Sequence, residues 1–100
     1  MFRQPSSGSA VIVGESDTFT FPFALNTGET ITSASVTVSL NWGTDTAPTG
    51  MLNGSPSISG EYVLQTITPT VAGNIYTLTA TATMSTGRIL KNRMMFETIA

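Results

Sequence analysis

"YTLTATATMSTGRILKNRMMF", residues 76–96, alternates between apolar residues and threonines along its first half. A period of two is the pattern of a β-strand with one buried face. The segment STGR, 85–88, then interrupts the alternation, and Gly87 suits the positive φ that a tight turn needs. After the turn, Leu90, Met94 and Phe96 can again share one face. The stretch therefore predicts a long hairpin with strands over 75–84 and 88–99.

The second strand of this hairpin has a mixed outer face. That face would carry Ile89, Lys91, Arg93, Met95, Glu97 and Ile99. Apolar side chains among charged ones indicate either a bulge or a second contact surface. Asn92 falls on the apolar face and needs a hydrogen-bond partner if it is buried.

The rest of the chain repeats the period of two in shorter segments. SDTFTFPF, 16–23, places Phe19, Phe21 and Phe23 on one face, and Pro22 marks an edge strand or a bulge because it cannot donate to a ladder. Further strands are expected at 11–13, 32–42, around Ile58 and at 61–68. About seven short strands with regular turns predict an all-β sandwich or small barrel.

Composition supports one β-rich domain and excludes several function classes. Ser and Thr supply 29 of the 100 residues, whereas only 10% of the residues are charged and the net charge is −2. This charge does not suit a nucleic-acid binder, which normally shows a basic stripe. The longest apolar runs are too short to span a membrane, and no signal peptide is recognisable. We therefore expect synthesis in the cytoplasm, a loose N-terminal arm over 1–9 and a single domain over 10–100.

The residue inventory also argues against catalysis. The chain has no Cys and no His, so thiol nucleophiles and Ser–His pairs are impossible. The six acidic residues are scattered, and weak Ca²⁺ binding by Glu15 and Asp17 is the less favoured interpretation of the closest pair. We predict no enzyme, no cofactor, no metal and no catalytic residue.

Two aromatic residues have alternative interpretations. Trp42 follows Leu40 in register, which favours the core, but beside the 43–50 loop it could instead stack on a sugar. In that second case Trp42, Tyr62 and nearby loops would form a carbohydrate-binding or adhesion module. Tyr76 lies where immunoglobulin-like domains place a tyrosine that bonds the preceding loop, although it could equally be an ordinary core residue.

Three segments in order resemble a group of small tailed-bacteriophage virion proteins. They are NTGETITSASVTV (26–38), SPSISG (55–60) and VAGNIYTLTATATMSTGRIL (71–90). The likeness covers roughly residues 16–99, and the ordered set carries it rather than any single segment. The start, SDTFTFPFAL, and the Met-rich end, LKNRMMFETIA, depart from the group's pattern, which bears on the partner surface and not on the fold.

The resemblance implies an immunoglobulin-like β-sandwich of about seven antiparallel strands with a flexible N-terminal arm. It also implies a non-enzymatic virion structural protein, made in the host bacterial cytoplasm, that bridges or decorates head–tail or fibre components as fibre–tail adaptors do. Capsid decoration is an alternative role. Partners would be portal or neck, tail, fibre or capsid proteins and further copies in a symmetric homo-oligomer. The expected partner-binding residues are Phe2, Arg3, Gln4, Pro5, Thr86, Gly87, Arg88 and Met95.

Overall fold

The computed structural model describes residues 2–3 and 9–100, with side chains from residue 10 onward. Within these ranges the chain forms eight strands and one 3-10 turn, and it has no α-helix. The elements are β1 Phe2–Arg3, β2 Ser9–Ile12, β3 Asp17–Pro22, β4 Ile31–Trp42, η1 Pro48–Met51, β5 Ser57–Ser59, β6 Tyr62–Ile67, β7 Ile75–Met84 and β8 Ile89–Ile99. Every strand expected from the alternating segments is present, which confirms the all-β prediction. None of the described elements is a helix that could cross a lipid bilayer.

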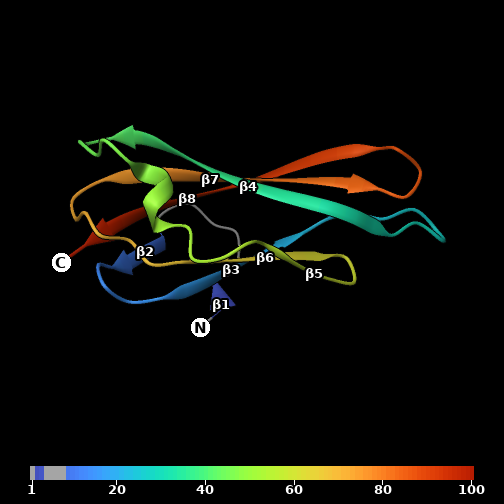
Figure 1. Ribbon diagram of the computed structural model, residues 1–100, viewed down its shortest axis with the longest axis horizontal. Coiled ribbons are helices and arrows are strands. Elements are labelled where there is room, and N and C mark those ends of the chain that lie inside the picture. Colours follow the sequence, from blue (N-terminus) through green and yellow to red (C-terminus); the bar gives the residue numbers. More distant parts are fainter. Residues whose placement is uncertain (1, 4–8) are drawn as a thin grey trace.

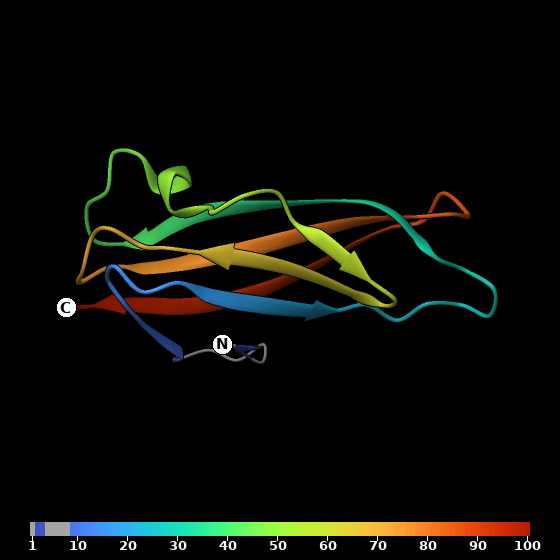
Figure 2. The same cartoon turned by 60° about the horizontal axis from the view of Figure 1, so that its bottom comes forward.

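The strands form two stacked four-stranded sheets (Figures 1 and 2). One sheet has the order β1-β3-β6-β5 and the other the order β2-β8-β7-β4. The molecule is elongated, with extents of 44 × 24 × 23 Å. Figure 1 shows the β7–β8 turn and the β3–β4 connection at one end of the long axis and the C-terminus at the other. The predicted sandwich is thus confirmed, and the arrangement is compatible with an immunoglobulin-like fold.

The two N-terminal strands pair parallel to their neighbours, unlike the antiparallel pairing expected throughout. Phe2 lies opposite Thr18 of β3, whereas Ser9 lies opposite Phe96 of β8. β1 and β2 therefore occupy edges of different sheets, so the N-terminal segment contributes to both layers. A pattern of alternation carries no information on strand direction, which explains the difference. The arm boundary at residue 9 stays a prediction.

An aromatic cluster lies at the centre of the core. The Phe96 ring lies 5.3 Å from that of Phe19 and 5.5 Å from that of Tyr76, measured between centroids. All three side chains are buried, as are Phe21 and Phe23. These contacts join β3 of one sheet to β7 and β8 of the other. Burying such rings is the main favourable term that holds the two layers together.

Asn92 and Pro22 link the two sheets at the side of the sandwich. Asn92 Nδ2 of β8 donates to the Pro22 carbonyl of β3 at 2.8 Å, which supplies the partner that the sequence required. Among the described residues β1 pairs only with Thr18 and Phe19, so no described strand lies beside Pro22 on that side of β3. Pro22 therefore sits where none of the described strands needs its missing N–H.

Candidate interaction surface

The sheet β2-β8-β7-β4 presents one face on the side opposite the core, which we call the outer face. Its β4 and β7 strands bear facing hydroxyl side chains because alternate residues of both strands point outward. The facing pairs are Ser33–Thr83, Ser35–Thr81, Thr37–Thr79 and Ser39–Thr77. The predicted threonine row is therefore one half of a double row, and neither strand adds a charge to it.

One end of the outer face is apolar except for Glu97. Trp42 of β4, Ile75 of β7 and Glu97 of β8 lie opposite one another in a row across the sheet. Met95 and Ile99 flank Glu97 along β8, and Ile99 pairs with Ile12 of β2. We call Ile12, Trp42, Ile75, Met95 and Ile99 the apolar patch. Of the seven large apolar side chains that are exposed among the described residues, five lie on the outer face: Ile12, Trp42, Ile89, Met95 and Ile99. Apolar side chains gathered in this way typically mark an interaction site.

Trp42 belongs to this patch because a β-bulge reverses its direction. Leu40 pairs with Tyr76, but Trp42 pairs with Ile75, so two steps along β4 match one step along β7. The extra residue turns Trp42 outward, and 67% of it is exposed. The prediction from its register with Leu40 that Trp42 lies in the core is therefore wrong.

A shallow hollow adjoins the exposed indole. Trp42, Ile75, Glu97 and Ile99 contribute to its lining, and its volume is about 490 Å³. A second, smaller hollow lies between Ile75, Met95 and Glu97. The patch thus has relief into which side chains of another molecule can fit.

A buried asparagine holds the chain segment that follows Trp42. Asn74 Oδ1 accepts from the Thr44 N–H at 3.1 Å, and Asn74 Nδ2 donates to the Thr44 carbonyl at 3.0 Å. Gly43 makes this close approach possible, because it adopts φ +110° and a Cβ there would lie 1.9 Å from Asn74 Oδ1. The indole is therefore carried by a backbone that is fixed on its C-terminal side.

Tyr76 extends this network into the loop. Its hydroxyl accepts from Asn74 Nδ2 at 2.9 Å and donates to Asp45 Oδ2 at 2.7 Å. Burial raises the pKa of Tyr76, and the neighbouring Asp45 carboxylate acts in the same direction. Tyr76 thus bonds Asn74, at the end of the preceding loop, as one alternative predicted, and it also anchors the loop after β4.

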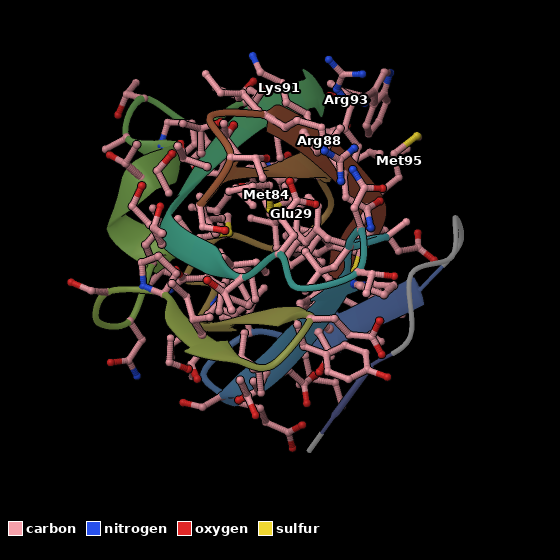
Figure 3. All side chains as sticks on the ribbon, turned by 90° about the vertical axis from the view of Figure 1, so that its right-hand side faces the viewer. Glu29, Met84, Arg88, Lys91, Arg93 and Met95 are labelled. Carbon is pink, nitrogen blue, oxygen red and sulfur yellow. The ribbon has the colours of Figure 1, made fainter. Side chains whose placement is uncertain are left out.

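The charges of the outer face all lie on β8. Figure 3 shows Lys91, Arg93 and Met95 pointing away from the core, whereas Met84 points into it. Glu97 follows on the same face of the strand. Lys91, Arg93 and Glu97 are exposed, and no ion pair joins them to other side chains in the part of the chain with described side chains.

The predicted contact residues of the 85–88 turn are engaged within the molecule. Arg88 Nη2 lies 2.5 Å from Glu29 Oε1, Arg88 Nε donates to Glu29 Oε2 at 3.1 Å, and Thr86 Oγ1 also donates to that carboxylate. Arg88 Nη2 further donates to the Ala24 carbonyl at 3.0 Å. The turn is thereby tied to the β3–β4 connection at one end of the sandwich, and Gly87 has the predicted positive φ of 92°.

Glu29 is the centre of this end cluster, although the sequence did not single it out. The Glu29 side chain is fully buried. Hydrogen bonds from Arg88, from the Asn26 N–H and from Thr86 lower the pKa of Glu29 from 4.5 to about 2. Hydrogen bonding to Glu29 in turn raises the pKa of Arg88. Arg88 and Thr86 therefore have a structural role that the partner-binding prediction did not anticipate.

The eight predicted contact residues do not form one site. Met95 lies in the apolar patch, seven residues after Arg88 in the chain, which corresponds to roughly 24 Å of extended chain. Phe2 and Arg3 are described only as the backbone of β1, and Gln4 and Pro5 lie outside the described residues. Among the residues described, no three acidic side chains come together as metal ligands would.

A protein-family model matches most of the chain. The model of a family described as "Podophage GP4 fiber-tail adaptor protein gp77" matches residues 14–97. No curated protein matches the chain.

Proposed function

The chain belongs to the podophage fibre–tail adaptor family, and we propose that it acts without catalysis, by bridging tail and fibre proteins in the virion. As a member of this family it is a phage structural protein. The bridging role, the absence of enzymatic activity and synthesis in the host cytoplasm go beyond the family match. The observation that carries the proposal is the outer face, where an exposed apolar patch adjoins an uncharged double row of hydroxyl groups.

The chemistry of the outer face suits protein contacts. Aromatic residues and methionine are enriched in protein interfaces, whereas lysine and acidic residues are depleted from their centres. Trp42 and Met95 are residue types that are enriched in interfaces. Burying the hydroxyl rows costs little free energy if groups of the partner satisfy their hydrogen bonds. Trp42 is also held on a fixed backbone by the Asn74 network, so little order has to be gained on binding.

Bridging requires contacts at more than one place on the molecule. The 85–88 turn and the N-terminal residues Phe2, Arg3, Gln4 and Pro5 stay proposed contact sites for a second partner. The exposed part of the turn remains available although Thr86 and Arg88 bind Glu29, because 37% of the Arg88 side chain is exposed.

Incorporation into virus particles tests the proposal. Trp42→Ser removes the largest side chain of the outer face without touching the core, so the folded variant should be missing from purified particles or reduced at least tenfold. Tyr62→Ser is the matched control, because Tyr62 is an exposed aromatic residue on β6 of the other sheet. Equal incorporation of Trp42→Ser and wild type would contradict a role of the outer face in assembly.

A carbohydrate-binding module is the second candidate, and the exposure of Trp42 favours it more than the sequence did. However, Trp42 and Tyr62 lie in different sheets, so they do not form a shared sugar-binding platform. Titration of the single tryptophan's fluorescence with host surface glycans separates the two functions. Saturable quenching of the fluorescence by a glycan supports sugar binding. An emission spectrum that stays that of a water-exposed tryptophan in the presence of glycans argues for the adaptor role alone.

A further inference from the structure

We propose that the hollow beside Trp42 binds an arginine side chain of a tail or fibre protein, whose guanidinium group lies over Ile75 between the indole ring of Trp42 and the carboxylate of Glu97. The inference rests on the proposed function in one respect, namely that a virion protein covers the apolar patch. It adds the chemical group that this partner brings to the patch.

Glu97 is a charged residue in apolar surroundings. Its neighbours across the sheet are Ile75 on β7 and Ala10 on β2. Along β8, Met95 and Ile99 stand on the same face, two positions before and after it. None of these four side chains offers a hydrogen bond to a carboxylate. Because Glu97 is exposed, water hydrates its carboxylate as long as the patch is uncovered.

Covering the patch would remove this water from Glu97. A buried carboxylate without a partner is strongly unfavourable, whereas one that pairs with a hydrogen-bonded cation is tolerated. Arg93 is the nearest basic residue on this face of β8, but it lies about 14 Å away along the strand. No ion pair to Glu97 forms among the side chains that the structure describes. The cation therefore has to come from the partner.

The polar groups that line the hollow favour a ligand that donates hydrogen bonds. The Asn74 side chain already bonds Thr44 and Tyr76. The Thr98 hydroxyl is buried and bonds the backbone of Asn74. Apart from the indole N–H, the lining side chain that still has hydrogen-bonding capacity is thus Glu97, and an ionised carboxylate only accepts. A guanidinium group has five N–H donors and no acceptor, whereas a sugar would find few partners for its hydroxyl oxygens.

Trp42 supplies the second half of the site. Trp42 and Glu97 flank Ile75 in one row of the sheet, two strand spacings or about 10 Å apart. All three residues line the hollow of about 490 Å³, which gives room above Ile75. A planar guanidinium group there can stack on the indole and donate two parallel N–H bonds to the carboxylate. A lysine ammonium group is more strongly hydrated and forms neither the stacked nor the bidentate contact.

Titration of the purified full-length protein with N-acetyl-arginine amide tests the site. The single tryptophan reports binding through its fluorescence, and NMR shifts of the indole N–H and of the Ile75 and Glu97 amides locate it. We expect saturable binding with a dissociation constant on the order of millimolar at physiological ionic strength, because one side chain makes the contact. Glu97→Gln should raise this constant at least fivefold, since the charge-assisted bonds are lost. N-acetyl-citrulline amide, which has a similar shape but no charge, should bind wild type at least fivefold more weakly.

Glu61→Gln is the matched control, because it removes an acidic charge at an exposed residue outside the outer face. Its dissociation constant should stay within about twofold of the wild-type value, as a distant exposed charge is screened. Three outcomes would overturn the inference: no saturable binding of the arginine derivative, equal binding of the citrulline derivative, or equal binding by Glu97→Gln. Saturable binding of a glycan but not of the arginine derivative would assign the hollow to a sugar instead.

Incorporation into particles separates the inference from the proposed function. Glu97→Arg should be reduced at least tenfold in purified particles, because it sets two like charges against each other in the contact. Glu61→Arg, with the same charge change outside the outer face, should be incorporated normally. If Trp42→Ser is excluded but Glu97→Arg is incorporated, the outer face contacts its partner without an arginine and the inference alone is wrong. If both variants are incorporated like wild type, the proposed function itself is wrong.

Discussion

Gly43 and Asn74 approach each other so closely that a single added carbon atom at Gly43 would overlap the Asn74 side chain. A Cβ at Gly43 would lie 1.9 Å from Asn74 Oδ1 and 2.7 Å from its Cγ. Gly43 also adopts φ +110°, a backbone conformation that residues with a side chain rarely adopt. The pair fixes the point at which β4 leaves the sheet and hence the position of the exposed Trp42.

Gly43→Ala should therefore destabilise the fold by about 2–4 kcal/mol, because the strained backbone and the displaced Asn74 bonds add up. Urea unfolding measures this change. Gly54→Ala is the control, since Gly54 also has a positive φ but its new Cβ would meet nothing within 4 Å. Equal losses in both variants would show that the contact with Asn74 contributes nothing.

Local patterns in the sequence predicted the strands but not the connections between them. The Phe19, Phe21 and Phe23 face, the threonine row of β7 and the turn at Gly87 each depend on residues close in the chain, and all three were predicted correctly. The bulge that turns Trp42 outward depends on how β4 pairs with a strand more than thirty residues away. A period of two cannot reveal such an extra residue, so the core interpretation of Trp42 was wrong.

The polar clusters were missed for a similar reason. Glu29 and Arg88 are 59 positions apart, and Asn74 and Thr44 are 30 apart. Nothing near Glu29 in the sequence distinguishes it from the solvated acids at other loops. Asn74 had a weak signal, because an asparagine between a turn and a strand of small and apolar residues needs hydrogen-bond partners if it is buried. The β8 charges were recognised as a mixed face, but their place beside Trp42 and Ile75 required the sheet order.

Tyr76→Phe should loosen the loop after β4 without changing the core. The hydroxyl joins Asn74 to Asp45, so its removal costs about 1–2 kcal/mol and frees the Asp45 side chain. Amide hydrogen exchange should increase at Thr44 and Ala47, whose N–H groups bond Asn74 and Asp45, while exchange in β8 stays slow. Tyr62→Phe serves for comparison because that tyrosine is exposed, and faster exchange at Thr44 in both variants would refute the specific role of Tyr76.

Glu29→Gln should destabilise the end of the sandwich that carries the 85–88 turn. The amide keeps the shape of the carboxyl group, but it has no charge to pair with Arg88. It also has a single acceptor oxygen, whereas Glu29 accepts hydrogen bonds at both Oε1 and Oε2. We expect the melting temperature to fall by on the order of 5 °C or more, as charge-assisted bonds to a buried group are lost. Glu61→Gln, at an exposed acid, should leave the melting temperature unchanged. If the Glu29→Gln protein has the same melting temperature as wild type, the cluster around Glu29 is dispensable for stability.

The same carboxyl group makes stability depend on pH in a defined window. The pKa of Glu29 is about 2 in the folded chain and near 4.5 when the chain is unfolded, so the folded state favours the ionised form. Its contribution to the free energy of unfolding is complete above the unfolded value and is lost as the pH falls from about 4.5 to about 2. Glu29→Gln lacks this titration, so the stability difference between wild type and variant should shrink steadily across that window. Urea unfolding at several pH values measures the difference, and carboxyl carbon NMR of Glu29 gives the folded pKa directly. If the difference in free energy of unfolding between wild type and Glu29→Gln stays constant from pH 5 to pH 2, Arg88 and Thr86 do not stabilise the ionised carboxylate.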